Sequence, residues 1–195
     1  MSTLHVENLK GLSSGGNANK VIIPSGQTLE VTDNVRHDDM PTGSVIQVVE
    51  HVGNGTSSQG YGTSTHYSST SYVNVDQAAL TITPKFATSK ILLLLSNHIY
   101  VTANSANDWR GARLRIQRGS TDILTDGNAY GEAMYFVGDS DRWMTHTPTM
   151  VYDSPNTTSA TTYTLQVSSK LGNVILMNNQ SYGSGGFFMA MEIAG

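Results

Sequence analysis

The chain has 195 residues and no cysteine, and charged residues make up only 13% of it. Ser, Thr, Asn and Gly together account for 77 residues, whereas hydrophobic residues account for 38%. This composition disfavours long surface helices and favours strands joined by many turns. It excludes a helical bundle or coiled coil, and the length fits one domain, or one domain with an appendage.

Charge and hydropathy argue against several classes of partner. The net charge of -4 is mild, so there is no basic field for nucleic acid or an anionic membrane. The longest apolar run, residues 91–95, is far shorter than the roughly 18 residues of a membrane span. Residues 1–10 lack the basic and apolar regions of a signal peptide. We therefore expect no nucleic-acid partner, no membrane insertion and no signal peptide. Without disulfides, oligomerisation is the obvious way to stabilise the fold.

The first 43 residues differ from the rest of the chain. Short strands are predicted at 4–9, 21–23 and 28–31, with turns at 11–17 and 24–26. Strands this short expose too little apolar surface to build a core of their own. We therefore predict that residues 1–43 form a stalk or docking segment wound with identical copies, with a linker at 38–43.

From residue 44 onward the pattern is continuous β. Strands are predicted at 45–52, 72–75, 80–84, 91–101, 113–117, 143–152, 163–167, 174–177 and 187–193, with a loop rich in Gly, Ser and Thr at 53–71. Strands at intervals of roughly 8 to 12 residues, separated by Gly, Asn and Ser, are typical of a sandwich or barrel. Residues 44–195 are thus predicted to form an all-β domain.

Two predicted strands are apolar on both faces, residues 91–95 and 187–191. Antiparallel sheets usually alternate because one face meets water, so these strands need cover on both sides. A covering loop is one explanation, and a subunit interface is the other. The missing disulfides and the sparse core favour the interface, for which Leu92, Leu94 and Phe188 are the candidate residues.

The sequence contains no strong catalytic motif. There is no phosphate-binding loop, no G-x-S-x-G and no HExxH. Glycan hydrolysis needs only two carboxylates, and five acidic residues cluster between 122 and 141, but several of them adjoin turn formers. Five of the six histidines are scattered without ligand spacing, and the sixth, His37, stands beside Asp38 and Asp39, where a solvated turn is the favoured interpretation. In a trimer, one histidine from each chain coordinating an ion on the threefold axis is the alternative. We therefore predict no enzyme activity, no catalytic residue, no cofactor and no metal.

Aromatic residues in the turn-rich segments are the more suggestive feature. The candidate receptor-binding residues are Tyr61, His66, Tyr67, Trp109, Tyr130, Trp143 and Tyr182. Aromatic rings of this kind offer a large rigid contact area with a polar handle, and they stack on the faces of sugars. Ordinary half-buried packing is the alternative interpretation.

Several segments resemble, in order along the chain, the short tail-fibre proteins of bacteriophages of marine bacteria and cyanobacteria. These are residues 16–29, 43–49, 80–84, 88–92, 114–121, 153–163 and 191–194. The segment DSPNTTSATTY at 153–163 is the most specific of them. The resemblance implies a trimeric β-sandwich head of jelly-roll type on a slender stalk, mounted on a virion and contacting the host surface.

On this resemblance, residues 44–195 are expected to bind a host cell-surface glycan or protein. Residues 1–43 are expected to bind other virion proteins, such as a tail adaptor, a nozzle or the capsid. The loops that vary in this family correspond to 53–71, 103–111, 126–142 and 179–186. A fibre assembles in the host cytoplasm, so it needs neither a signal peptide nor cysteines. The alternatives are a head fibre or other structural virion component, and a small glycan depolymerase.

Overall fold

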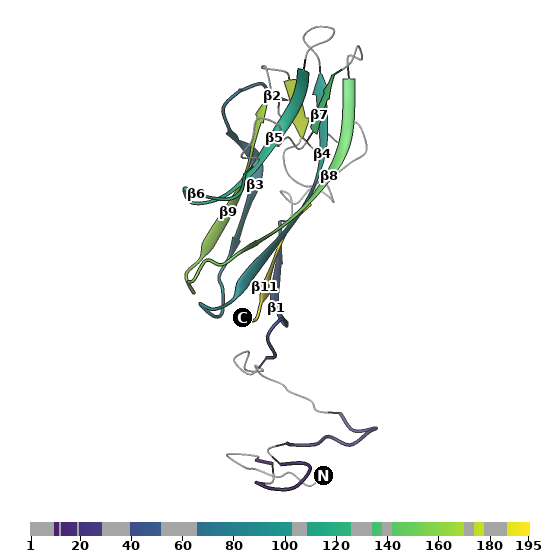
Figure 1. Cartoon of the computed structure of the whole chain (residues 1–195), viewed down its shortest axis with the longest axis vertical. Coiled ribbons are helices and arrows are strands. Elements are labelled where there is room, and N and C mark those ends of the chain that lie inside the picture. Colours follow the sequence, from purple (N-terminus) through teal and green to yellow (C-terminus); the bar gives the residue numbers. More distant parts are fainter. Residues whose placement is uncertain are drawn as a thin grey trace. The chain divides into compact units, whose positions relative to one another are not determined.

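The structure is a computed structural model of the whole chain (Figure 1). It describes residues 10–11, 13–18, 20–28, 40–51, 66–102, 109–125, 134–137, 142–169, 174–177 and 187–195. The chain divides into two compact units, Met1–Arg36 and His37–Gly195. In this division residues 37–43, which the sequence assigns to the stalk segment, group with the larger unit.

The described part of the smaller unit consists of turns. The Ala18 amide donates a hydrogen bond to the Gly15 carbonyl (3.0 Å), and the Gln27 amide donates to Pro24 (3.1 Å). The prediction of a strand at 21–23 is wrong, because these residues have no strand conformation and their side chains are about half exposed. A strand requires a hydrogen-bonded neighbour, and no described segment of the chain supplies one. The strands predicted at 4–9 and 28–31 fall wholly or mostly outside the described residues.

The larger unit is all-β in its described residues. Sheet A contains β1 (Val45–Glu50), β2 (His66–Tyr67), β4 (Lys90–Thr102), β8 (Arg142–Asp153), β10 (Val174–Met177) and β11 (Phe187–Ile193). Sheet B contains β3 (Val73–Ile82), β5 (Trp109–Arg118), β6 (Thr121–Thr125), β7 (Met134–Val137) and β9 (Thr161–Ser169). Every strand pairing is antiparallel. The prediction of an all-β domain is confirmed, and the two sheets are consistent with a β-sandwich.

The predicted strands differ from the observed ones in two respects. The strands expected at 72–75 and 80–84 belong to a single strand, β3, which contains an irregularity between Asn74 and Ala79. The short strands β2, β6 and β7 were not predicted. These short strands lie beside longer ones, β10 or β5, whose hydrogen-bonding groups they satisfy, so their pairing rather than their own sequence makes them strands.

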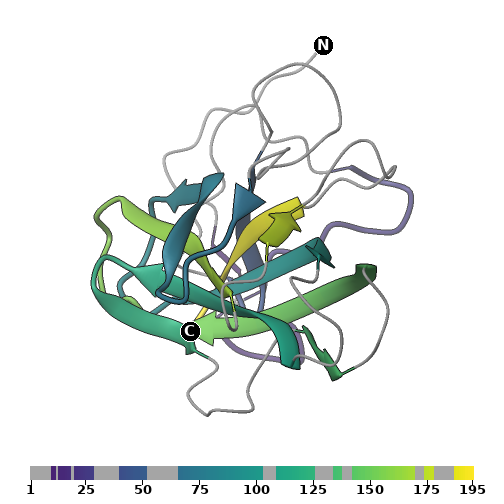
Figure 2. The same cartoon turned by 90° about the horizontal axis from the view of Figure 1, so that it is seen from above.

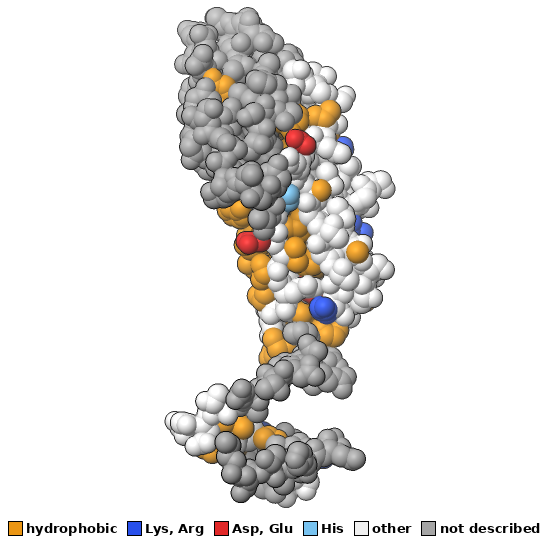
Figure 3. All heavy atoms as spheres, turned by 180° about the vertical axis from the view of Figure 1, so that it is seen from behind, with side chains coloured by type: hydrophobic (Ala, Val, Ile, Leu, Met, Phe, Trp, Pro, Cys, Tyr) orange, Lys and Arg blue, Asp and Glu red, His pale blue; other side chains and the backbone are white. Residues whose placement is uncertain are grey.

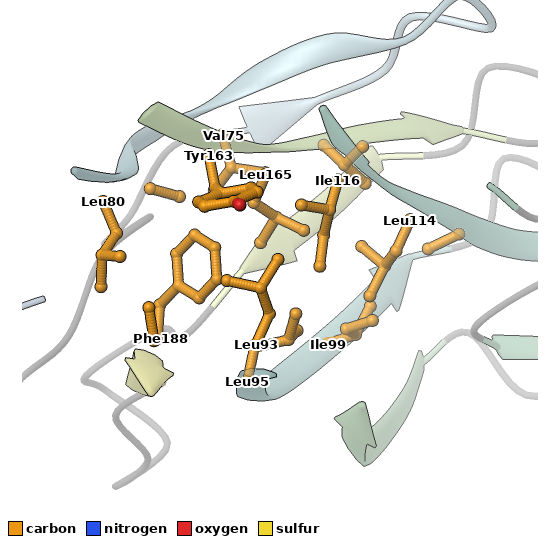
Figure 4. Close-up of a cluster of buried hydrophobic side chains, with 14 of the residues drawn as sticks. Val75, Leu80, Leu93, Leu95, Ile99, Leu114, Ile116, Tyr163, Leu165 and Phe188 are labelled. Carbon is orange, nitrogen blue, oxygen red and sulfur yellow. The ribbon is translucent and has the colours of Figure 1, made fainter. Parts of the chain in front are cut away.

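The two sheets face each other (Figure 2), and the hydrophobic core of the described residues lies between them (Figure 4). Sheet A contributes Leu93, Leu95 and Phe188, and sheet B contributes Ile116, Tyr163 and Leu165, all of them buried. These residues follow the period of two that a strand imposes, as the burial pattern of β11 shows. Burying each such side chain contributes about 1.5–3 kcal/mol, so this interdigitated layer holds the sheets together.

The chain enters and leaves the larger unit at the same end of sheet A. The Gly43 amide donates a hydrogen bond to the Ala194 carbonyl (2.8 Å), and the Ala194 amide donates to Ser44 (2.9 Å). Gly43 has a φ of 90°, a conformation that favours glycine. Nearby, the buried Glu192 carboxylate accepts hydrogen bonds from Gln47 Nε2 and from the Lys85 amide. This end of the unit is therefore closed by a dense set of hydrogen bonds.

A buried carboxylate on sheet A joins the two sheets. Asp153 Oδ2 accepts hydrogen bonds from Arg118 Nε (2.8 Å) and from the Tyr163 hydroxyl (2.7 Å), both on sheet B. Burial of the Tyr163 ring raises the pKa of its hydroxyl, and the adjacent Asp153 carboxylate raises it further. The hydroxyl thus remains a proton donor to Asp153, and the three side chains act as one inter-sheet clamp.

We predict that Asp153→Ala lowers the free energy of unfolding by about 2–3 kcal/mol, because it leaves a buried tyrosine hydroxyl without its acceptor. Asp122→Ala is the matched control, since Asp122 faces Arg115 at 3.6 Å with 36% of its side chain exposed. Its loss is expected to change the stability by less than about 1 kcal/mol. Chemical denaturation at one fixed protein concentration measures both values. Equal effects would show that Asp153 does not act as a clamp.

Candidate functional site

The outer face of sheet A is apolar across four neighbouring strands. The register places Met191 of β11 beside Leu92 of β4, and Leu92 beside Tyr152 of β8. The next row contains Met189, Leu94 and Met150. We call this surface the apolar face; its residues are Val48, Leu92, Leu94, Met150, Tyr152, Phe187, Met189 and Met191.

The apolar face is open to solvent in a single chain. Met150 is 64% exposed, and Phe187 is 49% exposed. Figure 3 shows hydrophobic side chains gathered in a band along the lower part of the larger unit. Scattered exposed apolar residues are normal on a protein surface, but a continuous apolar patch on one sheet face marks a contact surface.

The three predicted interface residues lie on opposite faces of sheet A. Leu92 and Leu94 are half-buried and belong to the apolar face. Phe188 points the other way, into the core, and is 0% exposed (Figure 4). Because neighbouring side chains of a strand alternate, the outward phenylalanine of β11 is Phe187. Phe187 therefore replaces Phe188 among the candidate interface residues, since a second subunit cannot reach a fully enclosed ring.

The outer face of sheet B is polar and hydrogen-bonded. Arg115 Nε donates to Gln166 Oε1 (2.7 Å), and Gln166 Nε2 donates to Asn74 Oδ1 (2.8 Å). The guanidinium of Arg115 also lies over the ring of Tyr72, at 4.3 Å from its centroid. The two outer faces of the unit thus have opposite chemistry, one apolar and the other an ordered polar array.

A pocket of about 540 Å³ lies at the edge of sheet B, beside the irregular part of β3. It is lined by residues 74–79 together with Tyr67 and Thr164. The Tyr67 hydroxyl accepts a hydrogen bond from the Asp76 amide (2.7 Å), so β2 anchors this part of β3. The sequence analysis did not include residues 74–79 among the candidate site residues. The sequence signal for them is the break between the strands predicted at 72–75 and 80–84, where β3 is irregular.

The expected aromatic site is only partly described by the structure. Tyr67 belongs to β2 and to the core and is 6% exposed, so it does not lie in an exposed loop as expected, although it also lines the pocket. Pairing of β2 with β10 turns its ring inward. The backbones of His66, Trp109 and Trp143 lie in β2, β5 and β8, while their side chains are outside the described part. Tyr61, Tyr130 and Tyr182 also lie outside the described residues.

The described residues contain neither a metal-binding cluster nor a membrane-spanning helix. No group of three or more His, Cys, Asp or Glu side chains is placed there to hold a metal ion. Within the same residues, no helix has the length and hydropathy to cross a membrane. The described features that could carry a function are therefore the apolar face, the polar array and the pocket.

Because Tyr67 lies in the core, we predict that Tyr67→Ala lowers the free energy of unfolding by about 3–5 kcal/mol. Tyr67→Phe keeps the ring and removes the hydroxyl that accepts the hydrogen bond from the Asp76 amide, so its cost is expected to be smaller, about 1 kcal/mol. Thermal or chemical unfolding of the two variants measures this difference. A Tyr67→Ala variant as stable as the parent would place the ring on the surface instead.

Comparison with known proteins does not assign the chain to a family. No protein-family model matches the sequence, and no curated protein matches it.

Proposed function

We propose that the protein is a virion fibre, specifically a phage tail fibre, whose larger unit is a homotrimeric head that adheres to a host cell-surface glycan or protein. The observation that carries this proposal is the apolar face, on which a single chain leaves Val48, Met150, Tyr152 and Phe187 exposed. The sequence resemblance to phage tail fibres supplies the biological setting and the threefold symmetry. Adhesion is binding rather than catalysis, so no enzymatic step is proposed.

The strand order supports a head of jelly-roll type. One sheet contains the order β1-β11-β4 with β8 on the other side of β4, and the other contains β3-β9-β5-β6. The longer strands β3, β4 and β5 alternate between the sheets along the chain, and so do β8, β9 and β11. This alternation, with the first and last strands paired in one sheet, is the pattern of two Greek keys wrapped into a sandwich. Jelly rolls occur in viral capsid and lectin domains, which agrees with the proposed setting.

Association through the apolar face has a clear driving force. Burying apolar area contributes roughly 25 cal/mol per Å², and flexible Met150, Met189 and Met191 adapt their shape to a neighbouring copy. The half-exposed Val21, Ile22 and Ile23 of the smaller unit would gain cover in the same way if three stalks wound together. Parallel copies would bring all three chain entries, at Gly43, to one end of the head.

The opposite end of the head is where host contact is proposed. There Thr102 of β4 pairs with Arg142 of β8 and with Val174 of β10. Trp143 lies opposite Val101, so its backbone is close to this end. Three copies of a weak site at this end would bind a repetitive cell surface by avidity.

The assembly predicts a solution mass three times that of the 21.0 kDa chain. Leu94→Glu combined with Met150→Glu places charges on the apolar face and is expected to shift the mass to that of a single folded chain. Thr162→Glu, on the exposed outer face of sheet B, is the matched control and should leave the assembly intact. Light scattering with circular dichroism measures mass and fold together. A folded parent chain of 21.0 kDa would overturn the proposal.

The site of the protein on the particle tests the fibre function directly. Antibodies raised against the purified protein are expected to label the tail of the phage particle in electron microscopy and to block adsorption to host cells. Labelling of the capsid without any effect on adsorption would indicate a head fibre instead. New reducing ends after incubation with host polysaccharide would indicate a depolymerase. Absence of label from purified particles would refute all virion assignments.

A further inference from the structure

The pocket at the edge of sheet B is built by a local expansion of β3. Asn74 pairs with Gln166 of β9, and Ala79 pairs with Thr164, so residues 75–78 lie opposite Leu165 alone. Within this bulge Gln77 has a φ of 57°, in the left-handed region that side chains other than glycine rarely adopt. Such strain persists only where the surroundings hold it, and it is concentrated at functional sites.

The surroundings hold this bulge firmly. The buried Tyr67 hydroxyl accepts a hydrogen bond from the Asp76 amide at 2.7 Å, next to the strained residue. Val75 and Ala78, on either side, are buried in the core. Asp76 and Gln77 are left exposed at the pocket. A β-bulge changes the direction in which the side chains of its strand point, and bulges are frequent beside binding sites.

The polar array orients a third pocket residue, Asn74. Arginine has only donors, so Arg115 Nε requires the oxygen of the Gln166 amide as its acceptor. The Gln166 nitrogen must then donate, and it donates to Asn74 Oδ1 at 2.8 Å. The amide nitrogen of Asn74 is thereby left as a hydrogen-bond donor for a ligand. Arg115 therefore sets the donor-to-acceptor direction of both hydrogen bonds, from Arg115 to Gln166 and from Gln166 to Asn74.

The pocket therefore offers a donor at Asn74, an acceptor at Asp76 and groups of both kinds at Gln77 and Thr164. Among the described residues, the side chains of Asp76, Gln77 and Thr164 have no hydrogen-bond partner within the protein. Adjacent hydroxyl groups of a sugar both donate and accept, so they match this set. The lining includes one carboxylate and no basic side chain, which disfavours a phosphate or sulfate.

We propose that this pocket binds a neutral saccharide. Its volume of about 540 Å³ lies within the range of roughly 300–1,000 Å³ typical of small-molecule sites, enough for a short sugar segment. The proposal deepens the adhesion function and rests on it, because it identifies the host ligand as a neutral glycan and adds a binding site on the flank of the head. Each copy in a trimer would carry one such pocket.

The test is binding of the full-length protein to an immobilised array of neutral, sulfated, sialylated and amino-sugar oligosaccharides. Binding to a neutral oligosaccharide is expected, followed by an affinity measurement by calorimetry with that compound. Asp76→Ala and Asn74→Ala are each expected to weaken binding at least tenfold. Gln117→Ala, on the same outer face but outside the pocket, is the matched control. Circular dichroism verifies that each variant is folded.

Gln77→Gly provides a second variant that relieves the backbone strain and should fold at least as well as the parent. It is expected to weaken binding through loss of the amide. Binding confined to anionic or cationic sugars, or unchanged by all three pocket variants, would overturn the proposal. In that case labelling of the phage tail would still support the fibre function. If saccharide binding depends on Asp76 but the protein is absent from virions, the pocket is a saccharide site and the protein is not a virion fibre.

Discussion

The alternation of side chains along β4 places leucines on both faces of sheet A, and the rest of the molecule depends on how these faces are covered. Leu93 and Leu95 meet sheet B and form the core, while Leu92 and Leu94 face outward with the methionines of β11. The inner leucines are buried within the chain, whereas Met150 and Tyr152 on the outer face remain exposed. This asymmetry is the physical reason for proposing an assembly.

The two sheets play different roles because their outer faces differ in chemistry. Sheet A presents apolar side chains that gain free energy when water is removed from them. Sheet B presents polar side chains, among which Arg115, Gln166 and Asn74 are linked by hydrogen bonds. The proposed function assigns the apolar face to self-association and the pocket of sheet B to a polar ligand. The Asp153 clamp joins the two sheets that carry these faces.

Much of the fold could be predicted from the sequence because strand periodicity is a local property. The strands at 174–177 and 187–193 were predicted with their observed limits, and the run at 91–95 correctly indicated a strand apolar on both sides. The prediction of a short strand at 21–23 is wrong, and β6 was not predicted, for the same reason. A short segment becomes a strand only when a neighbour pairs with it, and the local sequence does not contain that neighbour.

The sequence by itself determined the fold class, the absence of disulfides and the presence of two strands that need cover on both faces. Only the tertiary structure decided which side chains lie on each face. It turned Phe188 and Tyr67 into the core, and it assembled Asn74, Asp76, Gln77 and Thr164 around one pocket. The reason is that a shift of one residue in register, or a bulge such as that at 75–78, reverses the direction of every side chain beyond it. Register is set by contacts between distant segments, which the order of residues along one strand does not specify.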